Sequence, residues 1–253
     1  MNPETFTRLR RGLTLPLLLV VGWWAAYAFG LTESSLFVPP EKLFSLSSQD
    51  NEAVWRALGQ SLLRGVAGLA IGAALGLVAG VALGMSRRAE RFFALTLHSI
   101  KQVSLFAWLP LLTLWFGFGE SSKLAFIAWA AFFPVLLNTF EGVGSVPREW
   151  VEVARVNAYS HRQLLWRVVL PAALPSIFSG FYLALVFSWL ATLGAEYLLG
   201  SGSGMGVLLM ESRAEFHIDV MLFCILLVGA VGFAIDIAAK RLERRLLHWR
   251  DAH

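Results

Sequence analysis

This sequence contains little cysteine and few charged residues, and it lacks a nucleotide-binding motif. Its single cysteine, Cys224, excludes an intrachain disulfide and a CxxC metal or redox site. Only 15% of the 253 residues are charged, against about 25% in ordinary soluble domains. The glycine-rich segment 200–206 is not followed by the Gly-Lys-Ser/Thr of a phosphate-binding loop. The chain therefore has no nucleotide-binding loop of its own.

Apolar residues are correspondingly abundant, with 57% hydrophobic residues and a mean hydropathy of +0.64. A run of about 20 mostly apolar residues is long enough to cross a hydrocarbon core of about 30 Å. Six such runs predict an all-α, polytopic membrane protein with six transmembrane helices: Leu13–Leu31, Leu62–Gly84, Phe93–Gly117, Leu124–Phe140, Ile177–Leu199 and Val220–Ala239. The first run also has features of a signal peptide, but it continues past the small residues of a cleavage site, which favours a retained span.

The distribution of lysine and arginine predicts the orientation of these spans. Positive residues are retained on the cytoplasmic side of a membrane. With the N-terminus inside, 15 of the 21 basic residues fall in cytoplasmic segments. We therefore expect a cytoplasmic N-terminal segment (1–12), a six-helix transmembrane domain (13–239) with a long cytoplasmic loop (141–175), and a cytoplasmic C-terminal tail (240–253). This bias accounts for the net charge of +4 without a nucleic-acid partner.

The loop between the fourth and fifth predicted spans carries charges that do not belong in a membrane. Each charged residue at the bilayer centre would cost about 2–3 kcal/mol, so the segment Glu149–Pro175 must lie outside the hydrocarbon. Arg148 and Glu152 are four residues apart on a predicted amphipathic helix. Ser160 and Gln163 form a capping box that predicts a second helix. A helix, a turn and a second helix presented to the cytoplasm are suited to docking.

Seven positions of this loop follow a recognisable spacing: Glu152, Val153, Ala154, Ala158, Val168, Leu170 and Pro171. In this spacing the loop resembles that of the inner-membrane permease subunits of binding-protein-dependent ABC importers. The family pattern has a Glu, two small residues, a Gly six positions after the Glu, an aliphatic residue and a closing Leu-Pro. Ala158 stands in the Gly place, where Gly would permit a left-handed turn at no steric cost. We expect Asn157 to adopt that conformation instead.

The resemblance implies a function for this loop and a set of partners. Its first helix would be a coupling helix that fits a groove on an ATPase subunit, with Asn157 and the seven spaced residues as ATPase-coupling positions. The implied partners are an ABC ATPase dimer, which binds ATP and Mg²⁺, a second permease subunit expected to be identical, and an external substrate-binding protein. The chain itself would carry no cofactor and would lie in a bacterial inner membrane.

Other segments resemble a particular subgroup of these permeases. The segment AWLPLLTLWFGFGESSK, Ala107–Lys123, and the later segments GAEYLLGSGSGMG and SRAEFHIDV are similar to those of permeases for aliphatic sulfonates, taurine and nitrate. The resemblance implies a small, anionic solute. It leaves the individual solute open, because specificity in this family resides largely in the external binding protein.

Ionisable and small polar residues within spans are candidates for the translocation pathway or its gate. Lys101, eight residues into the third span, is either an interfacial anchor or a contact for an anion. Glu196, near the end of the fifth span, is either a gate or a packing residue. Ser104, Ser188 and Thr192 are candidates to line the pathway, against the alternative that they hydrogen-bond their own helix backbone.

Glycine recurs at every fourth position of the second span: Gly68, Gly72, Gly76, Gly80 and Gly84. A stripe of small residues allows another helix to approach closely. The partner is either a helix of the same subunit, which we favour, or a helix of a second subunit.

Two other classes of membrane protein compete with the ABC permease. A secondary, ion-coupled transporter usually has carboxylates near the membrane midplane, and no carboxylate lies near the centre of a predicted span. A membrane enzyme needs a convergent catalytic constellation, and the sequence shows no Ser/His/Asp, paired-carboxylate or histidine-rich arrangement. Neither an enzyme nor a metal-binding protein is therefore expected.

Overall fold

The computed structural model describes residues 51–86 and 102–246, together with isolated positions between residues 14 and 38 and between residues 92 and 100. Its regular elements are α3 (Asn51–Gly84), η1 (Leu105–Trp108), α5 (Leu109–Phe116), α6 (Glu120–Gly144), α7 (Arg148–Val156), α8 (His161–Leu164), η2 (Leu165–Val169), α9 (Leu170–Leu199), α10 (Met205–Ala214) and α11 (Ile218–Leu246). Within the described residues there is no β-strand. The predicted all-α class is confirmed.

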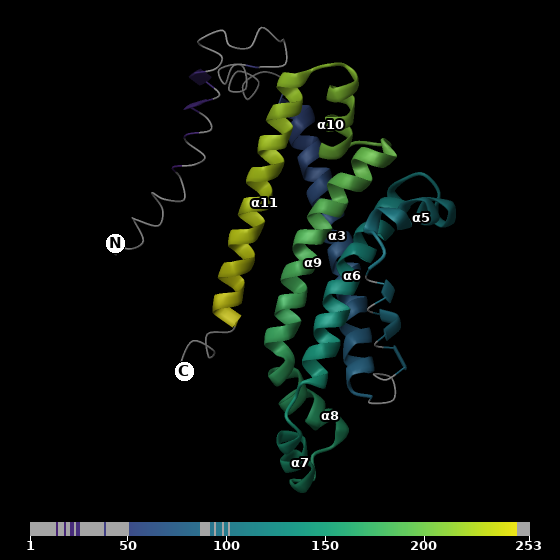
Figure 1. Ribbon diagram of the computed structural model, residues 1–253, viewed down its shortest axis with the longest axis vertical. Coiled ribbons are helices and arrows are strands. Elements are labelled where there is room, and N and C mark those ends of the chain that lie inside the picture. Colours follow the sequence, from purple (N-terminus) through teal and green to yellow (C-terminus); the bar gives the residue numbers. More distant parts are fainter. Residues whose placement is uncertain are drawn as a thin grey trace.

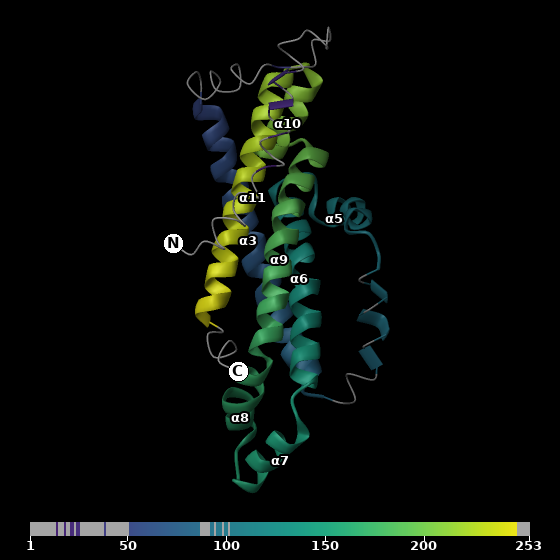
Figure 2. The same cartoon turned by 60° about the vertical axis from the view of Figure 1, so that its left-hand side comes forward.

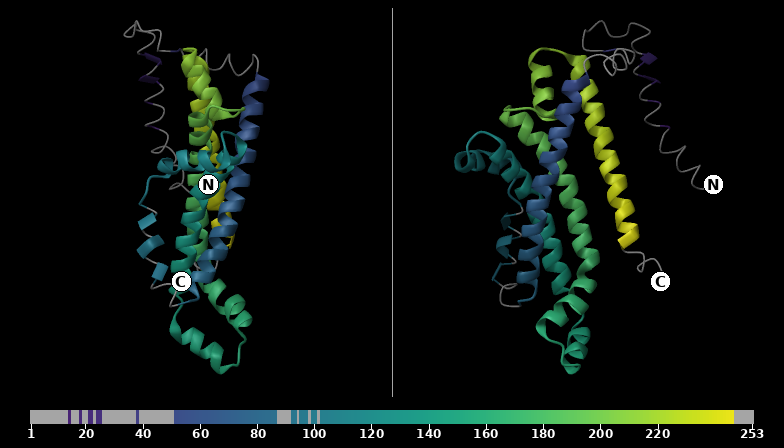
Figure 3. Two further views of the ribbon diagram at one scale, coloured as in Figure 1. Left: turned by 90° about the vertical axis from the view of Figure 1, so that its right-hand side faces the viewer. Right: turned by 180° about the vertical axis from the view of Figure 1, so that it is seen from behind.

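Three long helices, α3, α6 and α9, run side by side and form the centre of the molecule (Figure 1). The fourth long helix, α11, meets α9 and α10 and runs along the outside of this group (Figure 2). The short helix α10 lies at one end of the bundle and α7 and α8 lie at the other, whereas α5 projects from one side (Figure 3). We call these two ends the α10 end and the α7 end.

Four helical stretches are long and apolar enough to cross a membrane: Glu52–Gly84, Glu120–Gly144, His161–Leu199 and Ile218–Arg245. They contain the second, fourth, fifth and sixth predicted spans. The first predicted span and the N-terminal segment lie outside the described residues, apart from isolated positions, as do residues 247–253 of the predicted tail. Both membrane-crossing length and apolar composition therefore support a multi-pass membrane protein.

The third predicted span differs from the prediction. The run Phe93–Gly117 is not one continuous helix, because a turn at residues 102–104 interrupts it. Ser104 is extended, with ψ of 132°, and is followed by the short helix η1 and then by α5. Pro110 stands in the first turn of α5, where its missing N–H costs nothing and its fixed φ suits a new helix. Hydropathy detects the apolar run but not this break within it.

The close packing of α3 on α6 depends on the glycine stripe. A Cβ atom added at Gly76 would lie 2.6 Å from the carbonyl oxygen of Phe132, and one at Gly80 would lie 2.6 Å from the Cβ of Thr139. Both distances are well inside van der Waals contact, so only glycine allows the two backbones to come this close. The other members of the stripe, Gly68, Gly72 and Gly84, also face α6. The sequence alone left open which helix packs on the glycine stripe, and the structure shows that it is α6 of the same chain.

Helix α9 approaches α6 through a similar arrangement of small residues. A Cβ atom added at Gly180 would lie 2.8 Å from the carbonyl oxygen of Pro134. Ala131 and Ala184 are fully buried between these helices and leave no room for larger side chains. The three central helices therefore pack backbone against backbone, which favours dispersion contacts where the surrounding solvent is apolar.

Polar contacts join α11 to the bundle. The hydroxyl of Tyr182 in α9 donates a hydrogen bond to Asp236 Oδ1 at 2.5 Å, and Lys240 Nζ pairs with Asp236 Oδ2 at 2.7 Å. Only a small share of the apolar stretch of α11 is buried inside this chain. Within the described part of the chain, most of this helix is consequently left uncovered.

Candidate functional sites at the two ends of the bundle

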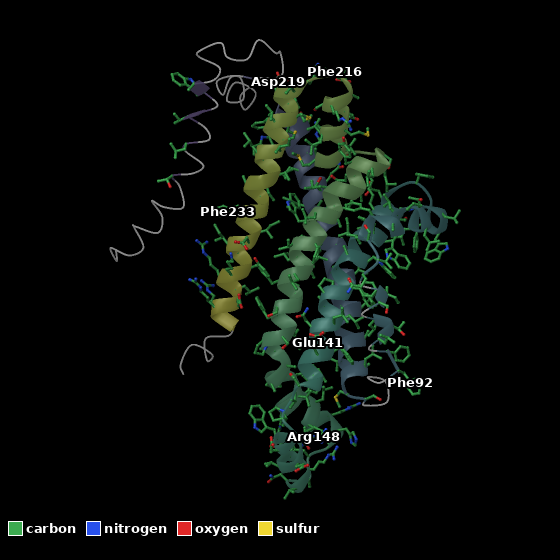
Figure 4. The ribbon with its side chains drawn as sticks, viewed as in Figure 1. Phe92, Glu141, Arg148, Phe216, Asp219 and Phe233 are labelled. Atoms are coloured by element: carbon green, nitrogen blue, oxygen red, sulfur yellow. The ribbon has the colours of Figure 1, made fainter. Side chains whose placement is uncertain are left out.

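Helix α7 exposes most of its apolar side chains. Trp150, Val153 and Val156 are 55%, 61% and 87% exposed, and Ala154 is the buried residue of this helix. The helix begins at Arg148, which Figure 4 marks at the α7 end. A contiguous exposed apolar surface edged by charges is typical of a protein interaction site. The α7 surface is therefore a candidate docking surface.

The end of α7 explains why the family pattern has a glycine there. Tyr159 N–H donates to Ala154 O at 3.0 Å and Ala158 N–H donates to Arg155 O at 2.9 Å, which is the pair of bonds of a Schellman motif. This motif needs a left-handed residue directly after the helix cap, and Ala158 has φ of 55°. The prediction that Asn157 takes the left-handed conformation is wrong: its φ is −80°. Because α7 ends at Val156 and Asn157 is its C-cap, the next residue, Ala158, must adopt the left-handed conformation.

The second helix of the loop begins as predicted. Ser160 N–H donates to the side chain of Gln163 at 2.8 Å, and Gln163 N–H donates to Ser160 Oγ at 3.3 Å. The capping box is thus confirmed. From here the chain stays helical to Leu199, through the π-helical turn η2, which ends two residues before Pro171. A π turn is a common way to accommodate a local irregularity without ending a helix.

A cavity of about 650 Å³ lies between α7 and the start of α9. Five of the predicted coupling residues line it, namely Val153, Ala154, Asn157, Val168 and Pro171. Glu152 is exposed on α7, and Leu170 is partly buried at the start of α9. The residues of the recognised spacing therefore lie together, with α7 packed on η2 and α8, just before α9 begins.

A buried ion pair lies near the α10 end. Arg64 in α3 forms an ion pair with Glu196 in α9, and the two residues are 7% and 0% exposed. Ser61 Oγ donates to Glu196 Oε2 at 2.8 Å, and Gly206 N–H donates to the same oxygen at 2.9 Å. Hydrogen bonds of this kind are what allow a charge to stay in an interior.

Two further charged residues from the start of α6 complete this group. Arg64 holds Glu120 with two bonds, Nε to Oε2 at 2.6 Å and Nη2 to Oε1 at 2.9 Å. Lys123, which is fully buried, lies 3.3 Å from Glu120 Oε1 and also donates to the carbonyl oxygen of Ser201. Arg64 Nη2 donates to Ser203 O at 3.2 Å. We call Ser61, Arg64, Glu120, Lys123 and Glu196 the Arg64 cluster.

The Arg64 cluster is electrically balanced, with two cations and two carboxylates. It therefore offers no spare positive charge to an anionic solute. What it does is join α3, α6, α9 and the loop before α10 at one point. The sequence contained one signal for it, since Arg64 stands inside an apolar run and an intramembrane charge requires a partner.

Residues 72–248 match the model of the family described as binding-protein-dependent transport system inner membrane component. The chain belongs to this family. The protein is therefore a transmembrane permease subunit of an ABC importer rather than an enzyme.

Individual relatives cover nearly the whole permease. The aliphatic sulfonates transport permease protein SsuC of Bacillus subtilis (strain 168) is 36% identical over 249 residues, which is 96% of this chain and 88% of the relative. The taurine transport system permease protein TauC of Escherichia coli (strain K12) is 32% identical and covers 93% of this chain and 88% of the relative. The predicted subgroup is confirmed.

Solved structures share the fold of the permease. An inward-facing conformation of the MetNI methionine ABC transporter matches with a TM-score of 0.65 and 17% identity, over 78% of this chain and 98% of that chain. An amino acid ABC transporter crystallised with histidines matches with a TM-score of 0.61 and 16% identity. At these identities the matches concern the fold.

Among the predicted pathway residues that the structure describes, none lines the cavity beside α7. Glu196 is buried in the Arg64 cluster and accepts a hydrogen bond from Ser61. Ser188 and Thr192 are buried and donate to carbonyl oxygens of their own helix, at 2.9 Å and 2.8 Å. Ser104 is exposed at the turn before η1. Lys101 lies outside the described residues.

We predict that Ala158→Gly stabilises the permease by about 0.5–1 kcal/mol, because glycine relieves the left-handed alanine while adding some backbone entropy to the unfolded chain. The measurement is the thermal unfolding midpoint of the purified protein in detergent. Ala154→Gly is the matched control, since it makes the same change inside α7 and should cost about 1 kcal/mol. A midpoint that falls in both variants would contradict the assigned turn.

We predict that Arg64→Met destabilises the permease by about 3–5 kcal/mol, because it leaves Glu196 charged and buried without its partner. Arg56→Met on the same helix is the control. Arg56 forms an exposed pair with Glu52, and such pairs contribute about 0–1 kcal/mol. The yield of folded monomer and its unfolding midpoint would be compared. Adding Glu196→Gln to Arg64→Met should recover part of the loss, and equal behaviour of the two arginine variants would disprove the account.

Proposed function

We propose that the permease forms, with a second copy of itself, the membrane pathway of an importer for a small anionic solute. Aliphatic sulfonates and taurine are the first candidates, because relatives named for them are 36% and 32% identical over nearly the whole chain. A bicarbonate transport system permease of Synechococcus elongatus is 30% identical over 78% of this chain. Bicarbonate and nitrate-like anions therefore come second.

The proposal includes three kinds of partner. A dimer of ABC ATPase subunits would bind ATP and Mg²⁺, since this chain contains no phosphate-binding loop. An external binding protein would capture the solute and deliver it, as the family description implies. The second permease subunit would complete the pathway, and the largely unburied face of α11 leaves room for contacts outside this chain.

The orientation follows from the excess of positive charge at the α7 end. With α7 and α8 in the cytoplasm, both termini would lie on the same side of the inner membrane and the α10 end would face outward. The chain would cross the membrane six times. The run Phe93–Gly117 would supply the third crossing in its interrupted form, in which α5 continues after the turn at Ser104.

The observation that carries the mechanism is the exposed apolar surface of α7 together with the packing of α7 on η2, the helical turn that leads into α9. ATP binding would bring the ATPases together and draw the two copies of α7 with them. Because residues His161–Leu199 form one helical stretch, a displacement of the α7 end is passed to α9 and along it to the Arg64 cluster. The pathway would then open outward, and hydrolysis would reset it. Such alternating access needs a bundle with two packed states and a ligand that distinguishes them.

We predict that Glu152→Lys uncouples solute transport from ATP hydrolysis. Glu152 is exposed on α7, so the substitution reverses a charge on the proposed docking surface without disturbing the core. The reconstituted complex, with its ATPase and with binding protein loaded with an alkanesulfonate, taurine, nitrate or bicarbonate, would be assayed for ATP hydrolysis and solute uptake. Wild type should respond to one of the loaded forms, and Glu152→Lys should lose that response by tenfold or more.

Glu243→Lys in α11 is the matched control, because it makes the same charge reversal away from α7. It should leave coupling unchanged. If Glu152→Lys retains assembly, hydrolysis and uptake, α7 is not the coupling element. Uptake that proceeds without ATP would instead support an ion-coupled transporter.

A further inference from the structure

Phe216 occupies a backbone conformation that a bulky side chain rarely adopts. Its φ is 58°. His217 N–H donates to Ser212 O at 2.8 Å and Phe216 N–H donates to Arg213 O at 3.3 Å, so Phe216 fills the left-handed position of the Schellman motif that ends α10. Glycine is the usual residue at that position. Strained residues of this kind persist where the side chain has a function.

The side chain of Phe216 is not buried in this chain. It is 82% exposed, and Figure 4 shows it beside Asp219 at the α10 end, far from Arg148. The nine residues around it include five ionisable ones: Glu211, Arg213, Glu215, His217 and Asp219. Charges at this density exclude the segment from the hydrocarbon. Phe216 therefore exposes a large apolar side chain to solvent in a segment rich in ionisable residues.

Hydrogen bonds hold α10, the helix that precedes Phe216, to α3 and α9. Helix α10 starts at Met205, whose N–H donates to Ser61 Oγ at 2.8 Å, and the next N–H, of Gly206, donates to Glu196 at 2.9 Å. Both acceptors belong to the Arg64 cluster. Arg213, one turn before Phe216, donates to the hydroxyl of Tyr197 in α9 at 2.7 Å. A side chain on a helix held in this way can bind a partner with little ordering cost.

We propose that Phe216 is an anchor for the external binding protein, inserting into an apolar pocket rimmed by charged groups on that protein. This inference rests on the proposed function, which places the α10 end outside the cell. An exposed aromatic residue flanked in sequence by ionisable residues suits an interface with an apolar centre and a polar rim. The left-handed backbone at Phe216 ends α10 and directs the ring outward. A helical conformation at Phe216 would instead continue α10.

The test is the variant Phe216→Gly, which relieves the strain and removes the ring. We expect its unfolding midpoint to rise and its basal ATP hydrolysis to stay unchanged in the reconstituted complex. The concentration of solute-loaded binding protein that gives half-maximal stimulation of hydrolysis should rise about tenfold or more. Phe216→Tyr should restore the wild-type value. Phe92→Ala is the control, because Phe92 is 79% exposed and lies away from the α10 end.

An unchanged half-maximal concentration in Phe216→Gly, with wild type stimulated normally, overturns this inference and leaves the proposed function intact. A wild-type complex that no loaded binding protein stimulates would count against the proposed function itself. A role confined to the turn is excluded if stability rises while binding-protein affinity falls, since a structural role predicts that both change in the same direction.

The membrane surface is the competing contact for an exposed ring, and a fluorescent probe separates the two. The single native cysteine, Cys224, is buried, so Phe216→Cys in a Cys224→Ala background can be labelled at one position of this chain. In lipid nanodiscs, a blue shift of the fluorophore on addition of loaded binding protein supports the anchor. Emission that is already blue-shifted in the nanodisc and does not respond to binding protein overturns it.

Discussion

A charge buried in a membrane protein must find its partner within the protein, and Arg64 of α3 does so by pairing with Glu196 of α9 and Glu120 of α6. Arg64 reaches α9 through Glu196 and α6 through Glu120, so a single guanidinium fixes the spacing of the central bundle at the α10 end. The glycine stripe does the same along the length of α3, where backbone contact with α6 leaves no room for a side chain.

The two ends of the molecule consequently have different mechanical properties. At the α10 end, buried charges with hydrogen-bonded partners hold the loop and α10 in place, and breaking such contacts is costly. At the α7 end, apolar side chains are exposed beside a cavity of about 650 Å³. Helix α9 connects them without interruption. A permease needs this combination, because a partner must be able to move one end while the other retains its shape.

The parts of this structure that could be predicted from sequence are those set by local signals. Long apolar runs identified α3, α6, α9 and α11, and the side chains of Ser160 and Gln163 identified the start of α8. The turn at Ser104 carries neither Gly nor Pro, the residues that most often mark a break in a helix. The left-handed residue was misassigned to Asn157 because tolerance of that conformation was considered without the register of the helix end, which puts Ala158 there. Arg64 and Glu196 are 132 residues apart, so only tertiary structure pairs them.

The central claim is that α7 is the surface through which the ATPase moves the permease. The most direct measurement is site-specific cross-linking in the assembled complex, with Val156→Cys in a Cys224→Ala background. Val156 is 87% exposed on α7, and Phe233→Cys, at an exposed position of α11, serves as the reference. The account predicts a cross-link between Val156→Cys and the ATPase subunit whose yield changes when ATP is added, and none from Phe233→Cys. An assembled, active complex in which Val156→Cys never cross-links to the ATPase would contradict it.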